Sequence, residues 1–496
     1  MKRTPRSLIP DCPNPSPDYT CTWQTQLYAT SDGKPEAQRR VLGEEALFGE
    51  EYPFGWSSFY RDARRDLLFV MDDSWDVPRD GDSTRYGSLL LDSGKFPEAT
   101  RGNVPNREAL GRLVERMRAL GWKGLGGWIC AKEAPHTLTD AEEIKQYWTE
   151  RLADADVSGF AYWKVDWGKR ADDAEFRRLL TDLGRQFAPH LTIEHAITPS
   201  VLPYSDVYRT YDVPAILSIP MTLRKLKELL PNSRAAVGYA GLLNCEDEAY
   251  IAAAGGFTMG IMRHPMAGAF PDGRADMSFP ACHRNLKTKM QEITRAVRWH
   301  RIAPAFGVGT GAVHIDPAEL RDTWRFEKPE EEIEAWWLTN PLLGGVHETL
   351  CSVSAPARIS RGCDLPTVTP DENGRVPFTV AARNPNGACS VATLGRTEGR
   401  SYGIPRCAVT LDIGDSRTVA AFGDYRELIL CGEIPNSCTV LMQDLAGETA
   451  YDITDAVLHT DGRLVIRGQC IREIGAEAQP ANDTSEAGVV IRIEES

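Results

Sequence analysis

Residues 159–168 read Gly-Phe-Ala-Tyr-Trp-Lys-Val-Asp-Trp-Gly, an apolar stretch that ends in two charged side chains. Its aromatic and β-branched residues favour a buried strand. Lys164 and Asp166 lie two residues apart, so an extended chain directs both side chains to the same side. Charges at the rim of a strand are costly unless they serve each other or a ligand. We expect Asp166 to be a catalytic nucleophile and Lys164 to hold the substrate beside it, with a structural ion pair between them as the alternative.

Several other apolar runs also end in acidic, basic or tryptophan side chains. They supply Asp72 and Asp73, Trp128, Glu194, Arg209, Asp212 and the polar stretch 244–247. In a barrel of parallel strands the carboxyl ends converge on one site. Carboxylates accept hydrogen bonds from hydroxyl groups, and tryptophan faces cover the apolar side of a sugar ring. The set predicts a small-molecule carbohydrate substrate, with two further carboxyl groups available for hydrolysis.

Elements that alternate along the chain must position these side chains. Amphipathic stretches such as 107–120 and 173–187 separate eight apolar runs, at 55–59, 67–72, 123–129, 160–167, 191–195, 207–212, 235–239 and 257–262. Strands that alternate with helices indicate parallel βαβ units, and eight of them close a (β/α)₈ TIM barrel. An open doubly wound sheet is the alternative, but no glycine-rich phosphate turn follows the first run.

The texture of the sequence divides the chain into three parts. Residues 1–50 lack clear periodicity, which predicts an irregular N-terminal leader that packs on the barrel. Residues 51–315 carry the alternating pattern of the barrel. Residues 316–496 hold short strand-like runs between turn signals, which predicts a C-terminal antiparallel β-sandwich domain.

Composition excludes several classes of partner. The 496 residues carry a net charge of −14, which argues against nucleic acid and anionic membranes. No apolar run is long enough to span a bilayer. The 12 cysteines form no CxxC pair and no Cys/His cluster, which favours reduced thiols in the cytoplasm and predicts neither a metal site nor a cofactor. The oligomeric state, including a homo-oligomer, stays open.

Several motifs occur in the order known from glycoside hydrolase family 27, the α-galactosidases. Residues 54–59 (FGWSSF) resemble that family's opening strand, and 72–75 (DDSW) resemble its Asp-Asp-Gly/Cys-Trp. Residues 92–126 contain DSGKFP, a helical pattern and LGWKGLG, similar to its Phe-Pro loop, helix and next strand. Residues 162–168 (YWKVDWG) resemble its nucleophile strand, and 207–212 (VYRTYD) its acid/base strand. The motifs span residues 54 to about 265, and the C-terminal β domain is similar by layout.

This resemblance implies an activity and a role for each matching residue. Asp166 would be the nucleophile and Asp212 the general acid/base of a retaining hydrolase that acts on α-galactosides. The substrate would contact Asp72 and Asp73 at O6 and O4, Lys164 at O3 and O4, Glu194 and Arg209 at the 2-hydroxyl side, and Trp56 and Trp128 along the wall of the site.

The sequence also departs from that family. The interval from Arg209 to Asp212 is one residue shorter, so Asp206 is a fallback for the acid/base. Gly168 and Lys169 stand where that family has a cysteine, which indicates a divergent or sister family. Alternatives are a β-L-arabinopyranosidase or a transglycosylase with the same site, a metal-dependent barrel enzyme of the enolase type, and a non-catalytic carbohydrate-binding protein.

Overall fold

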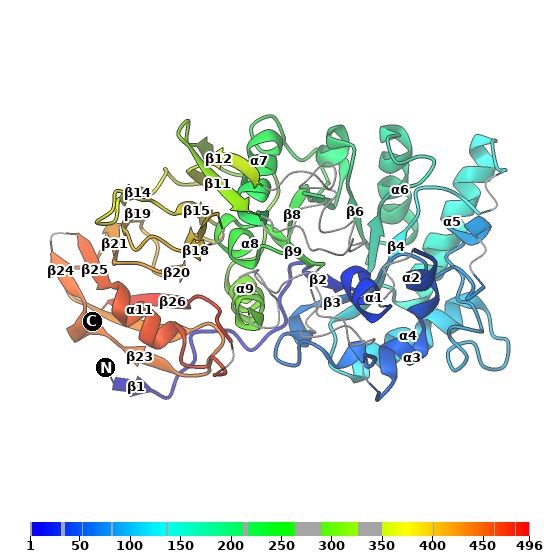
Figure 1. Ribbon diagram of the computed structural model, residues 1–496, viewed down its shortest axis with the longest axis horizontal. Helices are drawn as coiled ribbons and strands as arrows, with labels where there is room; N and C mark the ends of the chain where they lie inside the picture. Colours follow the sequence, from blue (N-terminus) through cyan, green and yellow to red (C-terminus); the bar gives the residue numbers. More distant parts are fainter. Residues whose placement is uncertain are drawn as a thin grey trace.

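Eight parallel strands close into a barrel, which confirms the predicted (β/α)₈ TIM-barrel architecture (Figure 1). In order they are β2 (Tyr19–Cys21), β3 (Leu68–Met71), β4 (Gly124–Ile129), β5 (Tyr162–Val165), β6 (Thr192–His195), β7 (Val207–Arg209), β8 (Leu242–Glu246) and β9 (Thr258–Ile261). The computed structural model describes residues 2–30, 35–51, 53–80, 83–134, 137–211, 217–262, 289–325, 350–399, 401–460, 462–481 and 483–495.

Helices follow most of the barrel strands and cover the outside of the barrel. They are α4 (Asn106–Ala119), α5 (Ala141–Ser158), α6 (Ala174–Phe187), α7 (Ser218–Leu229), α8 (Ala249–Gly255) and α9 (Met290–Ile302). Three shorter helices precede β3, namely α1 (Trp23–Ala29), α2 (Pro35–Val41) and α3 (Glu44–Phe48). The carboxylate of Asp140 accepts from the first N–H groups of α5, and Gly159 ends that helix at φ 71°. This left-handed turn, which glycine adopts without strain, leads the chain into β5.

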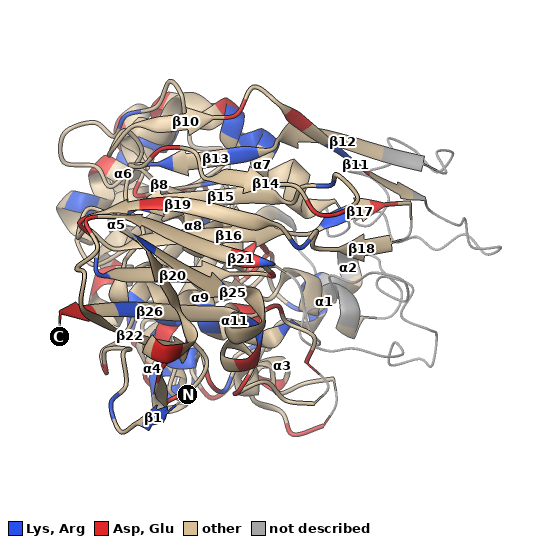
Figure 2. Cartoon of the chain, turned by 90° about the vertical axis from the view of Figure 1, so that its left-hand side faces the viewer, with Lys and Arg blue, Asp and Glu red and all other residues tan. Residues whose placement is uncertain are grey.

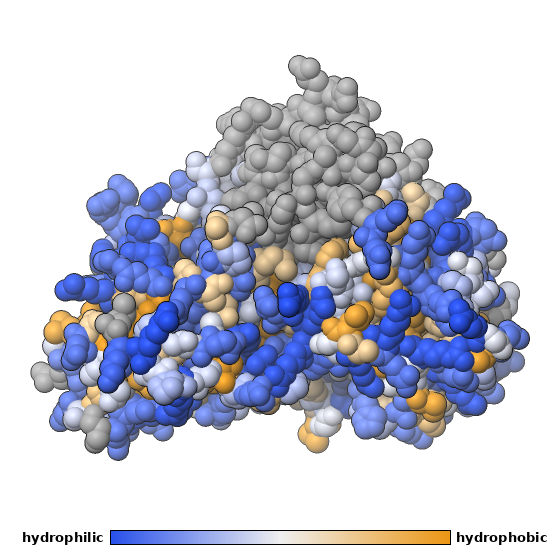
Figure 3. Space-filling model, turned by 90° about the horizontal axis from the view of Figure 1, so that it is seen from below, coloured by the Kyte–Doolittle hydropathy of each residue, from blue (hydrophilic) through white to orange (hydrophobic). Residues whose placement is uncertain are grey.

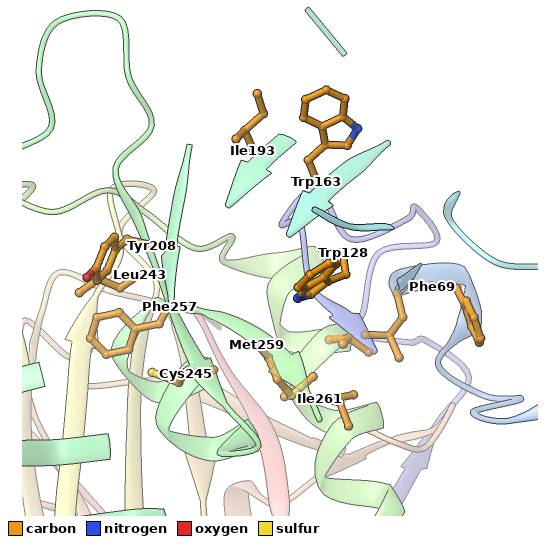
Figure 4. Close-up of a cluster of buried hydrophobic side chains, with 14 of the residues drawn as sticks. Phe69, Trp128, Trp163, Ile193, Tyr208, Leu243, Cys245, Phe257, Met259 and Ile261 are labelled. Atoms are coloured by element: carbon orange, nitrogen blue, oxygen red, sulfur yellow. The ribbon is translucent and has the colours of Figure 1, made fainter. Parts of the chain in front are cut away.

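Side chains along β5 alternate between the inside and the outside of the barrel. Tyr162 points inward, where its ring lies 5.0 Å from that of Tyr19. Trp163 points outward and packs against Trp148 of α5, with ring centroids 5.9 Å apart. Figure 4 shows Trp163 and its neighbour Ile193 among the buried apolar side chains around the strands. The alternation therefore fixes Lys164 on the inner face, beside the other polar strand ends.

A C-terminal β-sandwich packs against one side of the barrel, which confirms the second predicted domain type (Figure 1). Among the described residues, one sheet has the order β1-β23-β22-β26-β20-β16-β15-β13-β10 and the other β14-β19-β21-β25-β24. Side chains such as Val409, Leu411 and Ile491 form the apolar core of this domain. The opposite face of the larger sheet meets the barrel helices, where Phe422 stacks 4.8 Å from Tyr250 of α8. Figure 2 shows the sandwich strands as mostly uncharged.

The strands of the larger sheet are β1 (Lys2–Thr4), β10 (Val313–Ile315), β13 (Arg358–Arg361), β15 (Phe378–Arg383), β16 (Cys389–Leu394), β20 (Thr418–Phe422), β22 (Cys438–Asp444), β23 (Ala450–Asp452) and β26 (Gly488–Glu495). The smaller sheet holds β14 (Thr367–Thr369), β19 (Ala408–Gly414), β21 (Glu427–Gly432), β24 (Leu458–Thr460) and β25 (Arg463–Arg467). Two hairpins and a helix complete the domain, β11 (Glu319–Arg325) with β12 (Leu350–Pro356), β17 (Arg396–Glu398) with β18 (Ser401–Gly403), and α11 (Gly468–Gly475).

Two of the eight predicted strands are wrong. Residues 55–59 contain the 3₁₀ helix η1 (Trp56–Ser58) instead, and the first barrel strand is β2. Residues 235–239 form no strand, and the seventh barrel strand is β8, a few residues later. Residues 1–50 are not merely an irregular leader, because β2 closes the barrel and β1 joins the sandwich. The boundary predicted after residue 315 falls after β10, which already belongs to the larger sheet.

The surface of the molecule is mixed in polarity. The face in Figure 3 is mostly hydrophilic outside the grey residues, with apolar side chains in small groups between charged ones. Within the described part of the chain, no helix combines the length and the apolar character needed to cross a membrane.

Candidate active site

Asp166 follows β5 at the carboxyl end of the barrel and lies among donors. Its Oδ2 accepts a hydrogen bond from the indole N–H of Trp128 at 2.9 Å. The guanidinium of Arg209 lies 3.2 Å from Oδ1, yet Oδ1 accepts no well-directed hydrogen bond from the described residues. Burial raises the pKa of Asp166, but the charges of Arg209 and Lys164 outweigh it and hold that pKa below its usual range. The site thus presents an ionised carboxylate with one uncommitted oxygen.

Lys164 pairs with Asp72 and not with its sequence neighbour Asp166. Its Nζ lies 2.6 Å from Oδ2 of Asp72, and both side chains are almost fully buried. Burial lowers the pKa of Lys164, but the charge of Asp72 raises it by more than burial lowers it, so the ammonium group stays charged. The sequence had allowed an ion pair between Lys164 and Asp166, but the ion pair that forms joins Lys164 of β5 to Asp72 at the end of β3. The charge of Lys164 nevertheless lowers the pKa of Asp166.

Asp73 differs from Asp72 in its surroundings. Its Oδ1 accepts from the hydroxyl of Ser74 at 2.7 Å, and no cation makes an ion pair with it among the described residues. Burial, with a smaller contribution from the neighbouring charge of Asp72, raises the pKa of Asp73 to about 7. Lys95 holds this loop by donating to the carbonyl oxygen of Ser74 at 2.7 Å.

The backbone is strained after several of the barrel strands. Seven non-glycine residues in the described part of the chain have positive φ, and four of them lie one to three residues after barrel strands: Ser74, Ile197, Tyr211 and Asp247. Such conformations are unfavourable for residues with a Cβ and cluster at functional sites in proteins. The strained residues therefore lie at the carboxyl end of the barrel, where the polar strand ends predicted the active site.

Glu194 and Arg209 form a charged hub inside the barrel. Both oxygens of Glu194 accept from protein groups, Oε1 from the hydroxyl of Tyr19 at 3.0 Å, and Oε2 from Tyr162 at 2.9 Å and Asn244 at 2.8 Å. Burial raises the pKa of Glu194 to about 7. Arg209 lies within 3.3 Å of Glu194 and within 3.2 Å of Asp166. Glu194 is thus saturated by the protein, and Arg209 connects it to Asp166.

Glu246 at the end of β8 supplies a further carboxylate to this hub. One of its oxygens accepts from Arg209 at 2.9 Å. Three carboxylates, those of Asp166, Glu194 and Glu246, therefore share one guanidinium. Glu246 lies within the predicted polar stretch 244–247, whereas no pattern in the sequence singled out Tyr19 or Tyr162 as partners of Glu194.

Arg177 of α6 holds the backbone of Asp166 from below. Its guanidinium donates to the carbonyl oxygens of Asp166 at 2.7 Å, Val165 at 3.2 Å and Ala171 at 2.7 Å. Nδ1 of His195 lies 3.5 Å from the same guanidinium, and burial lowers the pKa of His195. Because Arg177 can only donate, Nδ1 accepts and the opposite nitrogen donates to Thr181 at 2.8 Å. Arg177 fixes the end of β5, a role that its sequence position did not reveal.

Three aromatic rings line the approach to Asp166. Trp128 lies 5.1 Å from Trp167 and 6.1 Å from Tyr86, measured between ring centroids. Trp167 is 38% exposed, unlike Trp128, which is buried. An exposed indole beside a carboxylate suits the apolar face of a sugar ring. Trp128 was predicted at the site, whereas Trp167 and Tyr86 were not.

Trp56 and Asp206 make no hydrogen bond or ion pair with this cluster among the described residues. The buried indole of Trp56 donates to the carbonyl of Pro53 at 2.7 Å and not to one of the polar strand ends. Asp206 precedes β7 and accepts from the backbone N–H of Ile193 at 3.0 Å, so it lies at the amino end of the barrel. Asp212 lies outside the described residues.

The charges of the cluster also bear on metal binding. In the described ranges, no three His, Cys, Asp or Glu side chains are grouped to hold a metal ion. Asp72 is already paired with Lys164, and Glu246 with Arg209. Both of these carboxylates therefore already have a protein cation within ion-pair distance.

Comparisons with known proteins find solved structures of very low sequence identity and low TM-score. No family model matches the chain, and no curated protein matches it. A family 27 β-L-arabinopyranosidase from Geobacillus stearothermophilus is 8% identical over 97% of each chain, with a TM-score of 0.41. An α-galactosidase from Saccharomyces cerevisiae, solved with raffinose, is 9% identical over 97% of this chain and 98% of its own, at 0.39. An Anoxybacillus α-amylase is 10% identical over 97% of each chain, at 0.41. Similarity at this level leaves the reaction to be inferred from the site.

Proposed function

We propose that the protein is a retaining glycoside hydrolase that removes terminal α-linked galactose, or a closely related sugar, from oligosaccharides or glycosides. The observation that carries the proposal is Asp166, an ionised carboxylate with an uncommitted Oδ1 beside an aromatic wall. A nucleophile needs a free lone pair, and Arg209 and Trp128 leave Oδ1 with one. The exposed face of Trp167 offers a platform for the sugar ring.

In the proposed reaction Oδ1 of Asp166 attacks the anomeric carbon while Asp212 gives a proton to the leaving oxygen. A water molecule deprotonated by Asp212 then cleaves the glycosyl–Asp166 ester and releases the sugar. This route requires the two carboxyl groups to lie about 5–5.5 Å apart. Asp72 and Asp73 are the hydroxyl acceptors, and Lys164 is held by Asp72 where it can contact the same sugar edge. Glu194 supports the site through Arg209, because protein donors already occupy both of its oxygens.

A β-L-arabinopyranosidase or a transglycosylase with the same nucleophile is the nearest alternative. β-L-arabinopyranose is galactose without its hydroxymethyl group, so the loop 72–74 would decide between the two sugars. A metal-dependent enolase-type reaction is less well supported, because Asp72 and Glu246 are already paired with Lys164 and Arg209. A non-catalytic sugar-binding role gives no reason for an ionised Asp166 whose Oδ1 accepts no well-directed hydrogen bond from the described residues.

The test begins with a panel of aryl glycosides, α-D-galactoside first and β-L-arabinopyranoside beside it. We expect wild-type hydrolysis of one of them without added metal, and at least a ~10⁴-fold loss in Asp166→Gly. Azide should restore part of the activity and yield the glycosyl azide with the anomeric configuration inverted, because it fills the space of the missing carboxylate. Asp172→Gly, an exposed position of the same loop, is the matched control and should keep wild-type activity. Full activity in Asp166→Gly would refute the assignment of Asp166 as the nucleophile.

A further inference from the structure

A cavity lies where the barrel meets the sandwich. Its volume is about 460 Å³, and its walls come from the chain at Pro10, the end of α9 at Arg301 and Ile302, and sandwich segments around Asn386, Asp415–Thr418 and Arg492. Arg301 pairs with Asp66 at 2.6 Å, and Asp66 precedes β3. The cavity therefore lies toward the amino ends of the barrel strands, opposite Asp166.

The lining of this cavity is basic, although the chain as a whole is acidic. Four arginines and one aspartate line it, whereas the whole chain has a net charge of −14. Three of the arginines have carboxylate neighbours: Arg301 pairs with Asp66, Arg383 with Asp415, and Arg417 lies 4.0 Å from Glu495. The fourth, Arg492, makes no ion pair among the described residues.

Of the four lining arginines, Arg492 is the one with a buried nitrogen that has no hydrogen-bond partner in the described part of the chain. Its Nε is buried and donates no hydrogen bond within the described chain. A buried donor attached to a cation is costly when no acceptor faces it. Arg492 could therefore donate to an anionic ligand without breaking a hydrogen bond of its Nε within the described chain.

The strand register places Arg492 on the barrel side of the larger sheet. Arg492 on β26 lies directly opposite Thr418 on β20, so their side chains share a face. Ile491 and Ile493, on either side of Arg492, belong to the core of the sandwich. Arg492 and Thr418 therefore both face the cavity, where a hydroxyl stands beside the guanidinium.

We propose that this cavity binds a small hydroxylated anion whose carboxylate or phosphate group pairs with Arg492. A guanidinium offers two parallel N–H groups that match either oxyanion. The volume is that of a small-molecule site, with room for a body of monosaccharide size. The ligand would touch the N-terminal chain, the last barrel helix and the sandwich at once. Binding therefore stabilises the contact between the two domains.

The test titrates the full chain by isothermal calorimetry with four probes: inorganic phosphate, glucose 6-phosphate, glucuronate and, at matched ionic strength, sodium chloride. We expect saturable binding of an oxyanion probe and none of chloride. Binding should be at least tenfold weaker in Arg492→Gln. Arg375→Gln is the matched control, because Arg375 is an exposed arginine of the same domain paired with Asp371. It should bind as the wild type does.

The outcomes separate the sources of the anion and overturn the proposal if it is wrong. Tighter binding of glucose 6-phosphate assigns a phosphate ester, and tighter binding of glucuronate assigns a carboxylate. Absence of binding for all three oxyanions, or binding by Arg492→Gln within twofold of wild type, overturns the site. Should Arg492→Gln fail to fold, Arg417→Gln on another wall of the cavity takes its place under the same criterion. The result does not depend on the glycosidase proposal.

Discussion

At the scale of single residues, Asp166 and Asp73 are acids whose surroundings move their pKa values in opposite directions. Arg209 and Lys164 hold Asp166 ionised, whereas burial raises the pKa of Asp73 to about 7. If ionised Asp73 accepts a sugar hydroxyl, kcat/KM falls as pH drops through about 7, because the proton removes the acceptor. The acid limb that Asp166 sets then lies lower, below the ordinary carboxyl range.

Asp73→Asn tests this reading, since the amide is neutral at every pH. We expect kcat/KM to fall by about 10–100-fold at pH 8, the size of a lost charge-assisted hydrogen bond. The inflection near pH 7 should weaken in the pH profile of kcat/KM, and what remains is set by Glu194, whose pKa burial also raises to about 7. An unchanged inflection in the variant would assign it to another group and refute the role given to Asp73.

Arg177 allows a second prediction at this scale, because it touches only the backbone of Asp166 and not its carboxylate. Arg177→Met should lower kcat by about 10–100-fold with little change in KM, since the nucleophile would be displaced while the sugar contacts remain. Arg177→Lys, which keeps a donor, should recover part of the loss. Arg178→Met, the neighbouring and half-exposed arginine of α6, is the control. An equal loss of kcat in both methionine variants would contradict a positioning role.

At the scale of elements, the end of β5 was predictable because its signal is local. An apolar run that ends in Lys164 and Asp166 predicts a buried strand with two charged side chains at its end, without information from the rest of the chain. The partners were not predictable, because each comes from a distant strand: Asp72 for Lys164 and Arg209 for Asp166. The side-chain chemistry allows Lys164 to pair with Asp72 or with Asp166, and the closure of the barrel determines that it pairs with Asp72.

Strand β2 shows where the periodicity signal fails. It has three residues, too few for an alternating pattern, yet Thr20 pairs with Phe69 of β3 and with Ile261 of β9. Tyr19 also supplies a hydroxyl to Glu194. The segment 55–59 looked more like a strand, but Gly55 at φ 80° starts a 3₁₀ turn there.

A proline exchange tests the position of β2. Thr20→Pro should destabilise the fold by at least ~3 kcal/mol, because proline donates no hydrogen bond in a strand flanked on both sides. Arg3→Pro is the matched control in β1, an exposed edge strand that pairs only with β23. Thermal unfolding should show a large loss for the first variant and a small one for the second. Equal midpoints would mean that residues 19–21 do not close the barrel.

At the scale of the whole molecule, the order of domains was readable because barrel and sandwich differ in the period of their apolar residues. The contact between the barrel and the sandwich was not predictable from the sequence, because it depends on single buried polar groups. Arg361 of β13 is the clearest of these. It donates to four carbonyl oxygens of the barrel, those of Gly255, Gly256, Phe306 and Gly307, at 2.8–3.0 Å.

Arg361→Met should therefore lower the stability of the whole chain. The change leaves buried carbonyl groups without donors at the end of α8, at about 1–3 kcal/mol for each group that water cannot reach. Arg358→Met is the control on the same strand, because Arg358 pairs within the sandwich with Asp316 at 2.6 Å. Calorimetry should give a clearly lower midpoint for Arg361→Met than for Arg358→Met. If the two midpoints agree, the bond between the domains rests on apolar contacts such as Phe422 with Tyr250 and not on this guanidinium.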